Sequence, residues 1–219
     1  MTGIDFNAPP GHFALKSVLQ ELFTVFDRRI HNLKDIDEKN FGKTFPVGED
    51  SYLENLLRTL SSLCEHCLPS VLATLIHWYK KQLKLIEESG EGMDDKRLVL
   101  NYIFCTALNE VLPQLHFFPT VCDDSVSYLV TLAFKEVAYT DHSSYGSKYN
   151  SYLMVTERFT EVLGVLSHTH GAVIQRAFMN ALNELRKENP ITPYTMNCII
   201  ALLMAMKFYR IKVGIFYYK

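Results

Sequence analysis

The stretch that decides the fold is residues 48–82, GEDSYLENLLRTLSSLCEHCLPSVLATLIHWYKKQ, which also holds the one tryptophan of the chain. Apolar residues at three-and-four spacing place one stripe on each of two successive helices. Pro69 cannot continue the first helix, but its fixed φ suits the first turn of a second one. Two amphipathic helices with almost no linker hide their stripes by folding back on each other. The stretch therefore predicts a helical hairpin that ends near Lys80 and Lys81. The predicted buried positions are Leu53, Leu56, Leu57, Leu60, Leu63, Cys64 and Cys67 in the first helix and Val71, Leu72, Leu75, Ile76, Trp78 and Tyr79 in the second.

Helical patterns continue on both sides of this hairpin. Residues 1–12 end in Pro9, Pro10 and Gly11 and predict a flexible arm, which a helix over about 13–33 follows. Downstream of the hairpin, the spacing predicts helices over about 97–112, 121–138, 152–167, 172–188 and 193–213. The core of the first of these, LVLNYIFCTAL, is apolar nearly all round, which predicts burial between neighbours. Residues suited to helix N-termini stand at several predicted starts, namely Glu49 and Asp50, Asp123 or Asp124, and Thr192 followed by Pro193.

The helices define the expected fold class. Apart from the short candidate IFYY at 215–218, no segment shows the alternating pattern of a β-strand. About eight helices are expected, and pairs of them recur roughly every 40 to 50 residues, as in HEAT and armadillo units. The sequence therefore predicts an all-α, HEAT/armadillo-like α-solenoid with its helices in antiparallel pairs, and a compact multi-helix bundle is the alternative.

The composition limits the classes of function. The chain has 219 residues, with 22 Lys and Arg against 24 Asp and Glu, so its net charge of −2 offers no bulk positive field for nucleic acid. Its five cysteines are an odd number, and most lie in apolar stripes, which indicates a reducing compartment such as the cytosol or nucleus. The N-terminus lacks the basic start and apolar run of a signal peptide.

The last predicted helix raises the question of a membrane. Its apolar core, MNCIIALLMAM, covers only 196–206, against the roughly 20 residues that a bilayer span requires. Charged residues follow it at Lys207, Arg210 and Lys212. We therefore expect a buried core helix and no transmembrane segment.

Cys64-Glu65-His66-Cys67 is the motif that most resembles a site, because a C-x-x-C pair can bind zinc or act in redox chemistry. Helical spacing, however, puts both sulfurs on the apolar stripe and turns His66 away from it. Structural zinc requires four ligands, and no second Cys/His pair has matching spacing. A thioredoxin-like motif would need a preceding strand. The motif predicts core packing of Cys64 and Cys67.

Three further groups have the residue types of a site without its geometry. His168 and His170 lack a local acidic or cysteine partner and fit a solvated helix end. Asp141, His142, Ser143 and Ser144 lie in the predicted loop over 140–151, where adjacent residues cannot form a catalytic triad, and no G-x-S-x-G elbow occurs. That loop is a candidate for phosphorylation, which mass spectrometry would detect. Glu157 and Glu161 share one helical face but lack the E-x-x-H partners of a di-iron site.

The helices of this chain resemble, in order, those of the Furry family's N-terminal cell-morphogenesis domain. Within 48–82 the resemblance lies in GED, then L-x-x-L-x-S-L-x-E-H-C-L-P-S, L-x-T-L, WY and K-x-Q. It continues through LAFK at 132–135, EVLGVL at 161–166, FMNALNELR at 178–186 and IIALLMAMKFYRIK at 199–212. An earlier part of it lies in Gly11, Phe13, Leu15, Ser17 and Phe23, and another in Phe104 with EVL at 110–112. It thus covers about 11–212, which is expected to be one helical domain over 13–212 followed by a divergent tail over 213–219.

The resemblance implies a function that the residues alone do not. Furry-like proteins are very long HEAT/armadillo-type scaffolds that bind NDR-type AGC kinases, which work with Mob coactivators, in polarised growth, cell shape and neurite patterning. The resemblance implies a non-enzymatic cytoplasmic scaffold at the cell cortex or sites of polarised growth, in contact with the cytoskeleton. It implies no cofactor, metal or catalytic residue. No kinase-contact residue carries over.

The end of the chain carries a further expectation. The resemblance stops near residue 212, so we expect an N-terminal fragment or short isoform whose C-terminal apolar face promotes self-association. Two other classes of function remain as alternatives: a metal-dependent or hydrolytic enzyme, and a membrane-surface module built on the C-terminal helix.

Overall fold

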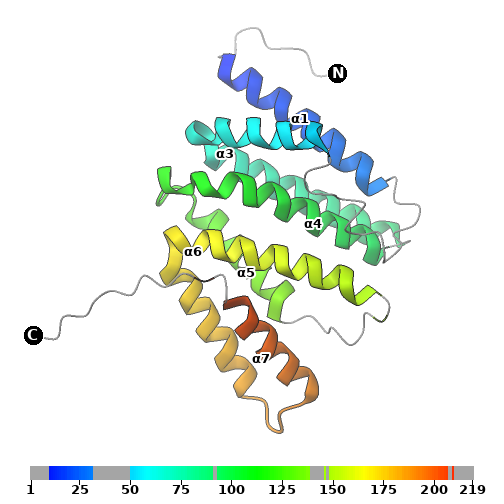
Figure 1. Cartoon of the computed structure of the whole chain (residues 1–219), viewed down its shortest axis with the longest axis vertical. Coiled ribbons are helices and arrows are strands. Elements are labelled where there is room, and N and C mark those ends of the chain that lie inside the picture. Colours follow the sequence, from blue (N-terminus) through cyan, green and yellow to red (C-terminus); the bar gives the residue numbers. More distant parts are fainter. Residues whose placement is uncertain are drawn as a thin grey trace, which may run out of the picture. The chain divides into compact units, whose positions relative to one another are not determined.

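The computed structural model describes residues 10–31, 50–90, 93–138, 146, 148–206 and 209. In these residues all regular structure is helical, which confirms the predicted all-α class (Figure 1). The elements are α1 (Pro10–His31), α3 (Ser51–Ser89), α4 (Met93–Val111), the 3-10 helix η1 (Leu112–Phe117), α5 (Asp123–Ala138), α6 (Tyr149–Arg186) and α7 (Pro193–Ala205). They belong to two compact units, Met1–Gln114 and Leu115–Lys219.

The count of helices differs from the predicted eight. The described residues contain six α-helices, because α3 and α6 each join two predicted helices across one non-helical residue. In α3 this residue is Cys67 (φ −143°, ψ 22°), two positions before the predicted break at Pro69. In α6 it is His170 (φ −118°, ψ 36°), next to the predicted separator Gly171. Both predicted breaks are therefore kinks rather than loops, and the α-solenoid remains a prediction.

Contacts with α1 show that α3 folds back on itself. Near its start, Tyr52 donates a hydrogen bond to Glu21 (2.8 Å). Near its end, Trp78 and Gln82 both donate to Asp27 (3.1 and 2.9 Å). A straight helix would separate residues 52 and 82 by about 45 Å, whereas residues 21 and 27 of α1 are only about 9 Å apart along its axis. The two arms of α3 therefore lie against the same part of α1, and the predicted hairpin is confirmed.

The second arm of α3 forms the core of the first unit. Its six predicted core residues, Val71, Leu72, Leu75, Ile76, Trp78 and Tyr79, are all buried. The indole of Trp78 stacks on Phe23 of α1, with ring centroids 5.2 Å apart and an interplanar angle of 8°. Tyr79 stacks on Phe104 of α4, with centroids 4.2 Å apart, and its hydroxyl donates to Asn101 Oδ1 (2.8 Å). These rings join α1, α3 and α4 into one packed layer of helices.

Helix α4 is buried on nearly every side, as its apolar sequence predicted. Within LVLNYIFCTAL, all positions except Thr106 are buried. A helix without a polar face requires neighbours all round, and α1 and α3 both pack against α4.

Several boundaries differ from the predicted ones. Helix α1 begins at Pro10 rather than at residue 13, and α3 continues beyond Lys81 to Ser89, because Gln82 and Ile86 extend its buried stripe. Gly90, at φ 67°, then ends α3 in the left-handed conformation that glycine adopts readily. Helix α4 starts at Met93, α6 starts at Tyr149, and α7 extends only to Ala205. The tail over 213–219 and most of the arm over 1–12 lie outside the described residues. The single domain over 13–212 stays a prediction.

The second unit is built from α5, α6 and α7, each of which packs against the other two. The predicted inward positions of α5, which are Val126, Leu129, Val130, Ala133, Phe134 and Val137, are all buried. Thr192 caps α7 by accepting a hydrogen bond from the backbone N–H of Thr195 (3.1 Å), and Pro193 follows in the first turn, as predicted. The kink at His170 redirects the second arm of α6 (Figure 1).

Candidate functional sites

Cys64 and Cys67 lie where α3 bends. Cys64 is fully buried, Cys67 is half-buried, and both are free thiols. The Cys67 thiol donates to the carbonyl of Leu63 (3.1 Å), while Glu65 and His66 are exposed. Burial raises the pKa of the Cys64 thiol to about 12, with a smaller contribution from Cys67. A buried thiol with a raised pKa offers little thiolate for nucleophilic attack. The predicted core packing holds for Cys64, whereas Cys67 is only half-buried.

The rates of thiol modification are expected to follow this burial. At pH 8, iodoacetamide should modify Cys67 faster than Cys64 in the folded chain, and 8 M urea should remove the difference. Peptide mass spectrometry after timed quenching measures both rates. Faster modification of Cys64 would contradict the packing described for it.

Stability is expected to fall at alkaline pH for the same reason. A pKa raised from 9.0 to about 12 means that the unfolded Cys64 thiol ionises first as the pH rises. The unfolded state then binds fewer protons than the folded state, so the free energy of unfolding decreases between about pH 9 and pH 12. Urea titrations across this range should show a smaller decrease in Cys64→Ala than in the wild type, measured relative to each protein's stability at pH 7.

The histidine pair differs from its prediction. His168 is exposed, as a solvated helix end would be, but the His170 side chain is only 8% exposed. Its Nε2 lies 3.3 Å from Asp123 Oδ1 at the start of α5, and its Nδ1 lies 2.9 Å from the Thr169 hydroxyl. The expected solvated end is therefore wrong for His170, which sits at the kink of α6 and contacts α5. Sequence reasoning missed Asp123 as a partner because it lies 47 positions away.

The remaining candidate motifs do not form a described site. The group at Asp141, His142, Ser143 and Ser144 lies outside the described residues, as does most of the loop over 140–151. Glu161 forms an ion pair with Arg158 (2.8 Å). In the described parts of the chain, no three His, Cys, Asp or Glu side chains come close enough together to hold a metal ion.

Among the helices that the structure describes, α3 meets the length and composition of a membrane span, whereas the sequence raised this question for the last helix. α3 contains an 18-residue window of mean hydropathy 1.2, of which 39% is buried within the structure. Core helices of soluble proteins meet the same criterion, so this is weak support for a span. α7 is apolar but shorter, at 13 residues.

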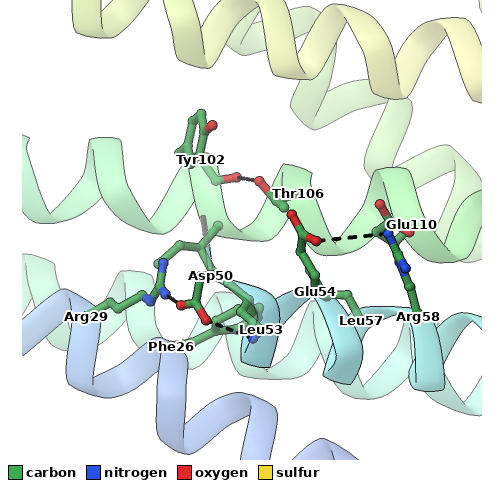
Figure 2. A pocket seen from close by; sticks show the side chains of 11 residues that line it. Phe26, Arg29, Asp50, Leu53, Glu54, Leu57, Arg58, Tyr102, Thr106 and Glu110 are labelled. Carbon is green, nitrogen blue, oxygen red and sulfur yellow. Dashed lines mark hydrogen bonds and ion pairs between the residues drawn. The ribbon is translucent and has the colours of Figure 1, made fainter. Parts of the chain in front are cut away.

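The first unit contains a pocket of about 250 Å³ between α1, the first arm of α3 and α4 (Figure 2). Its lining residues are Phe26, Arg29, Asp50, Leu53, Glu54, Leu57, Arg58, Tyr102, Ile103, Thr106 and Glu110. The apolar wall includes Phe26, Leu57 and Ile103, each at most 4% exposed. Charged side chains from all three helices surround this wall.

The charges of the pocket fall into two groups (Figure 2). On one side, Arg29 forms an ion pair with Asp50, which also caps α3 by accepting from the Leu53 N–H (3.0 Å). On the other side, a guanidinium nitrogen of Arg58 lies 4.0 Å from a carboxylate oxygen of Glu54, and the Arg58 side chain is 75% exposed. Asp50 was predicted to favour the N-terminus of this helix, and that role is confirmed. The pocket itself was not predicted, because residues 26 and 110 are brought together only by the fold.

The exposed face of α7 corrects the expectation of a buried core helix. Thr195, Cys198, Leu202 and Ala205 are buried, but the opposite face is apolar and open. Its members, Met196, Ile200, Leu203 and Met204, are between 47% and 62% exposed. They follow helical spacing, so they form one stripe, which we call the α7 stripe. Stripes of this kind mark interaction surfaces more often than single exposed residues do.

The described residues thus define an all-helical protein of bent, closely packed helices with an apolar face on its last described helix. The chain belongs to the cell morphogenesis N-terminal family, whose signature matches residues 94–214, more than half of its length. This agrees with the resemblance to Furry proteins from residue 94 onward, whereas the resemblance over 48–82 lies outside the match. No solved structure significantly matches the chain. Membership of this family associates the chain with cell morphogenesis.

Proposed function

We propose that the chain is a non-enzymatic scaffold that binds an NDR-type AGC kinase together with its Mob coactivator. The observation that carries this proposal is its membership of the cell morphogenesis N-terminal family over residues 94–214. The role would be the control of cell shape, polarised growth and neurite patterning, from a cytoplasmic position at the cell cortex.

A scaffold of this kind acts by position. Helices packed in pairs give a rigid surface on which several shallow contacts can add together. A kinase and a coactivator held on one surface meet at a raised effective concentration without any catalytic residue of the scaffold. An α-solenoid arrangement of the helices would suit this role, and we include it in the proposal.

Two other classes have less support. A hydrolase or metalloenzyme would use the cysteines, histidines or acids discussed above, and the described ones are packed in the core, paired or exposed singly. A membrane-surface helix normally carries lysine or arginine opposite its apolar face, and α7 contains neither. The α7 stripe therefore fits a protein surface better than a lipid one.

The scaffold proposal is tested with purified components. The chain, immobilised through an affinity tag, is mixed with purified NDR-type kinase, with Mob coactivator, and with both. Retention of the kinase–Mob pair is expected, and the tag alone serves as the control. Failure to retain either partner, under conditions in which a full-length Furry-type scaffold retains both, would exclude these residues as the binding site.

The α7 stripe is expected to cause self-association of the isolated chain, because the apolar area it exposes is contiguous. Multi-angle light scattering should show a mass that rises with protein concentration. Leu203→Glu, within the stripe, should shift the chain toward the monomer.

A matched control is Leu85→Glu on α3, since Leu85 is 47% exposed and Leu203 is 55% exposed. A strictly monomeric wild-type chain, or equal effects of the two substitutions, would contradict a role for the α7 stripe.

A further inference from the structure

We propose that the pocket between α1, the first arm of α3 and α4 binds the side chain of an arginine presented by a partner protein. This binding site goes beyond the scaffold function, because it does not depend on the partner being a kinase or a coactivator.

The size of the pocket favours a single side chain. Sites for small molecules and cofactors usually have volumes of about 300–1,000 Å³, whereas this one has about 250 Å³. A buried apolar wall of Phe26, Leu57 and Ile103 lines it. Such a wall suits the aliphatic stem of a long side chain, which can lie on apolar surface while its charged head stays near polar groups.

The charge of the pocket favours a cationic head. Three acidic and two basic side chains line it, so its formal charge is −1. Arg29 and Asp50 are paired with each other, which leaves the excess negative charge with Glu54 and Glu110. The pair between Glu54 and Arg58 is at the outer limit of an ion pair, at 4.0 Å, and Arg58 is largely exposed. Such pairs contribute little, so an incoming cation can replace Arg58 at small cost.

Glu110 stands where a carboxylate is unfavourable to the free protein. It lies in the last turn of α4, next to the negative end of the helix dipole. Its backbone carbonyl accepts from the Ser61 hydroxyl (2.7 Å), which fixes this turn against α3. Within the described residues, no hydrogen bond or ion pair involves its carboxylate. A cation bound in the pocket would offset the repulsion between this carboxylate and the helix end.

Arginine meets both requirements better than other residues do. Its guanidinium is weakly hydrated, carries five N–H donors and can bond to two carboxylates at once. Glu54 and Glu110 present two such groups from different helices (Figure 2). Arginine is also enriched at protein interfaces.

The test uses the full chain with ¹³C-labelled isoleucine and leucine methyl groups. N-acetyl-arginine N-methylamide is titrated, and N-acetyl-citrulline N-methylamide is its neutral isostere. We expect saturable shifts of the Ile103 and Leu57 methyl signals with arginine, and about fivefold weaker binding of citrulline. Glu110→Gln should weaken arginine binding by a similar factor and leave the melting temperature unchanged or slightly higher, because it removes the repulsion with the helix end.

Glu65→Gln is the matched control, since Glu65 is an exposed glutamate of α3 outside the pocket. It should leave arginine binding unchanged. Equal binding of arginine and citrulline, absence of shifts at Ile103 and Leu57, or equal losses in Glu110→Gln and Glu65→Gln would overturn the proposal.

Discussion

Tyr79→Ala is expected to lower the free energy of unfolding of the first unit by about 3–5 kcal/mol, the usual cost of removing a large buried aromatic side chain. Tyr79 is 1% exposed, and its ring stacks on Phe104 of α4. The substitution therefore removes the contact that joins the second arm of α3 to α4 and leaves a cavity between them. Urea unfolding of the full chain, followed by circular dichroism, measures the loss.

A pair of conservative substitutions separates the ring from its hydroxyl. Tyr79→Phe keeps the ring but loses the bond to Asn101, so it should cost about 1 kcal/mol. Tyr52→Phe loses a comparable bond to Glu21 on the exposed surface and should cost clearly less. If Tyr79→Ala were no more destabilising than Tyr79→Phe, the described packing of α3 on α4 would be wrong.

Asp27→Ala is expected to destabilise the first unit by about 2–3 kcal/mol, because it leaves buried donors unpaired. The Asp27 carboxylate accepts from Trp78 Nε1 and from Gln82 Nε2, and both donors belong to residues at most 6% exposed. These bonds attach the second arm of α3 to α1. Denaturant unfolding measures the effect.

The control for this prediction is Glu65→Ala, which removes an exposed carboxylate from α3 and should change stability by less than about 0.5 kcal/mol. In a double-mutant cycle with Gln82→Ala, the two losses should not add, since they share one hydrogen bond. Additive losses, or equal losses in Asp27→Ala and Glu65→Ala, would contradict the attachment of α3 to α1.

Much of the fold could be predicted because it depends on local patterns. The stripe from Val71 to Tyr79, the all-round apolar α4 and the cap at Thr192 each carry their own evidence within a few residues. The kinks were located to within two positions for the same reason, because Pro69 and Gly171 mark them. Their sharpness was not predictable, since Cys67 and His170 leave the helical conformation as single residues within otherwise continuous helices.

The pocket and the α7 stripe could not be predicted in this way. Which of two apolar faces of α7 is buried depends on α5 and α6, and the burial of Cys198 and Leu202 rather than Ile200 and Leu203 is a tertiary choice. Similarly, Arg29 and Asp50 are paired across 21 positions by the fold, and nothing local to either residue indicates the other. Long-range partners of this kind are where sequence reasoning fails.

The central claim is that this chain is a scaffold for a kinase–coactivator pair, and the affinity of the purified chain for NDR-type kinase with Mob coactivator tests it most directly. Biolayer interferometry should give saturable binding that the monomeric Leu203→Glu variant retains, which separates specific binding from adhesion through the α7 stripe. The claim would be contradicted if neither the wild-type chain nor the Leu203→Glu variant bound the kinase–Mob pair. It would also be contradicted if Leu203→Glu abolished binding while Leu85→Glu preserved it.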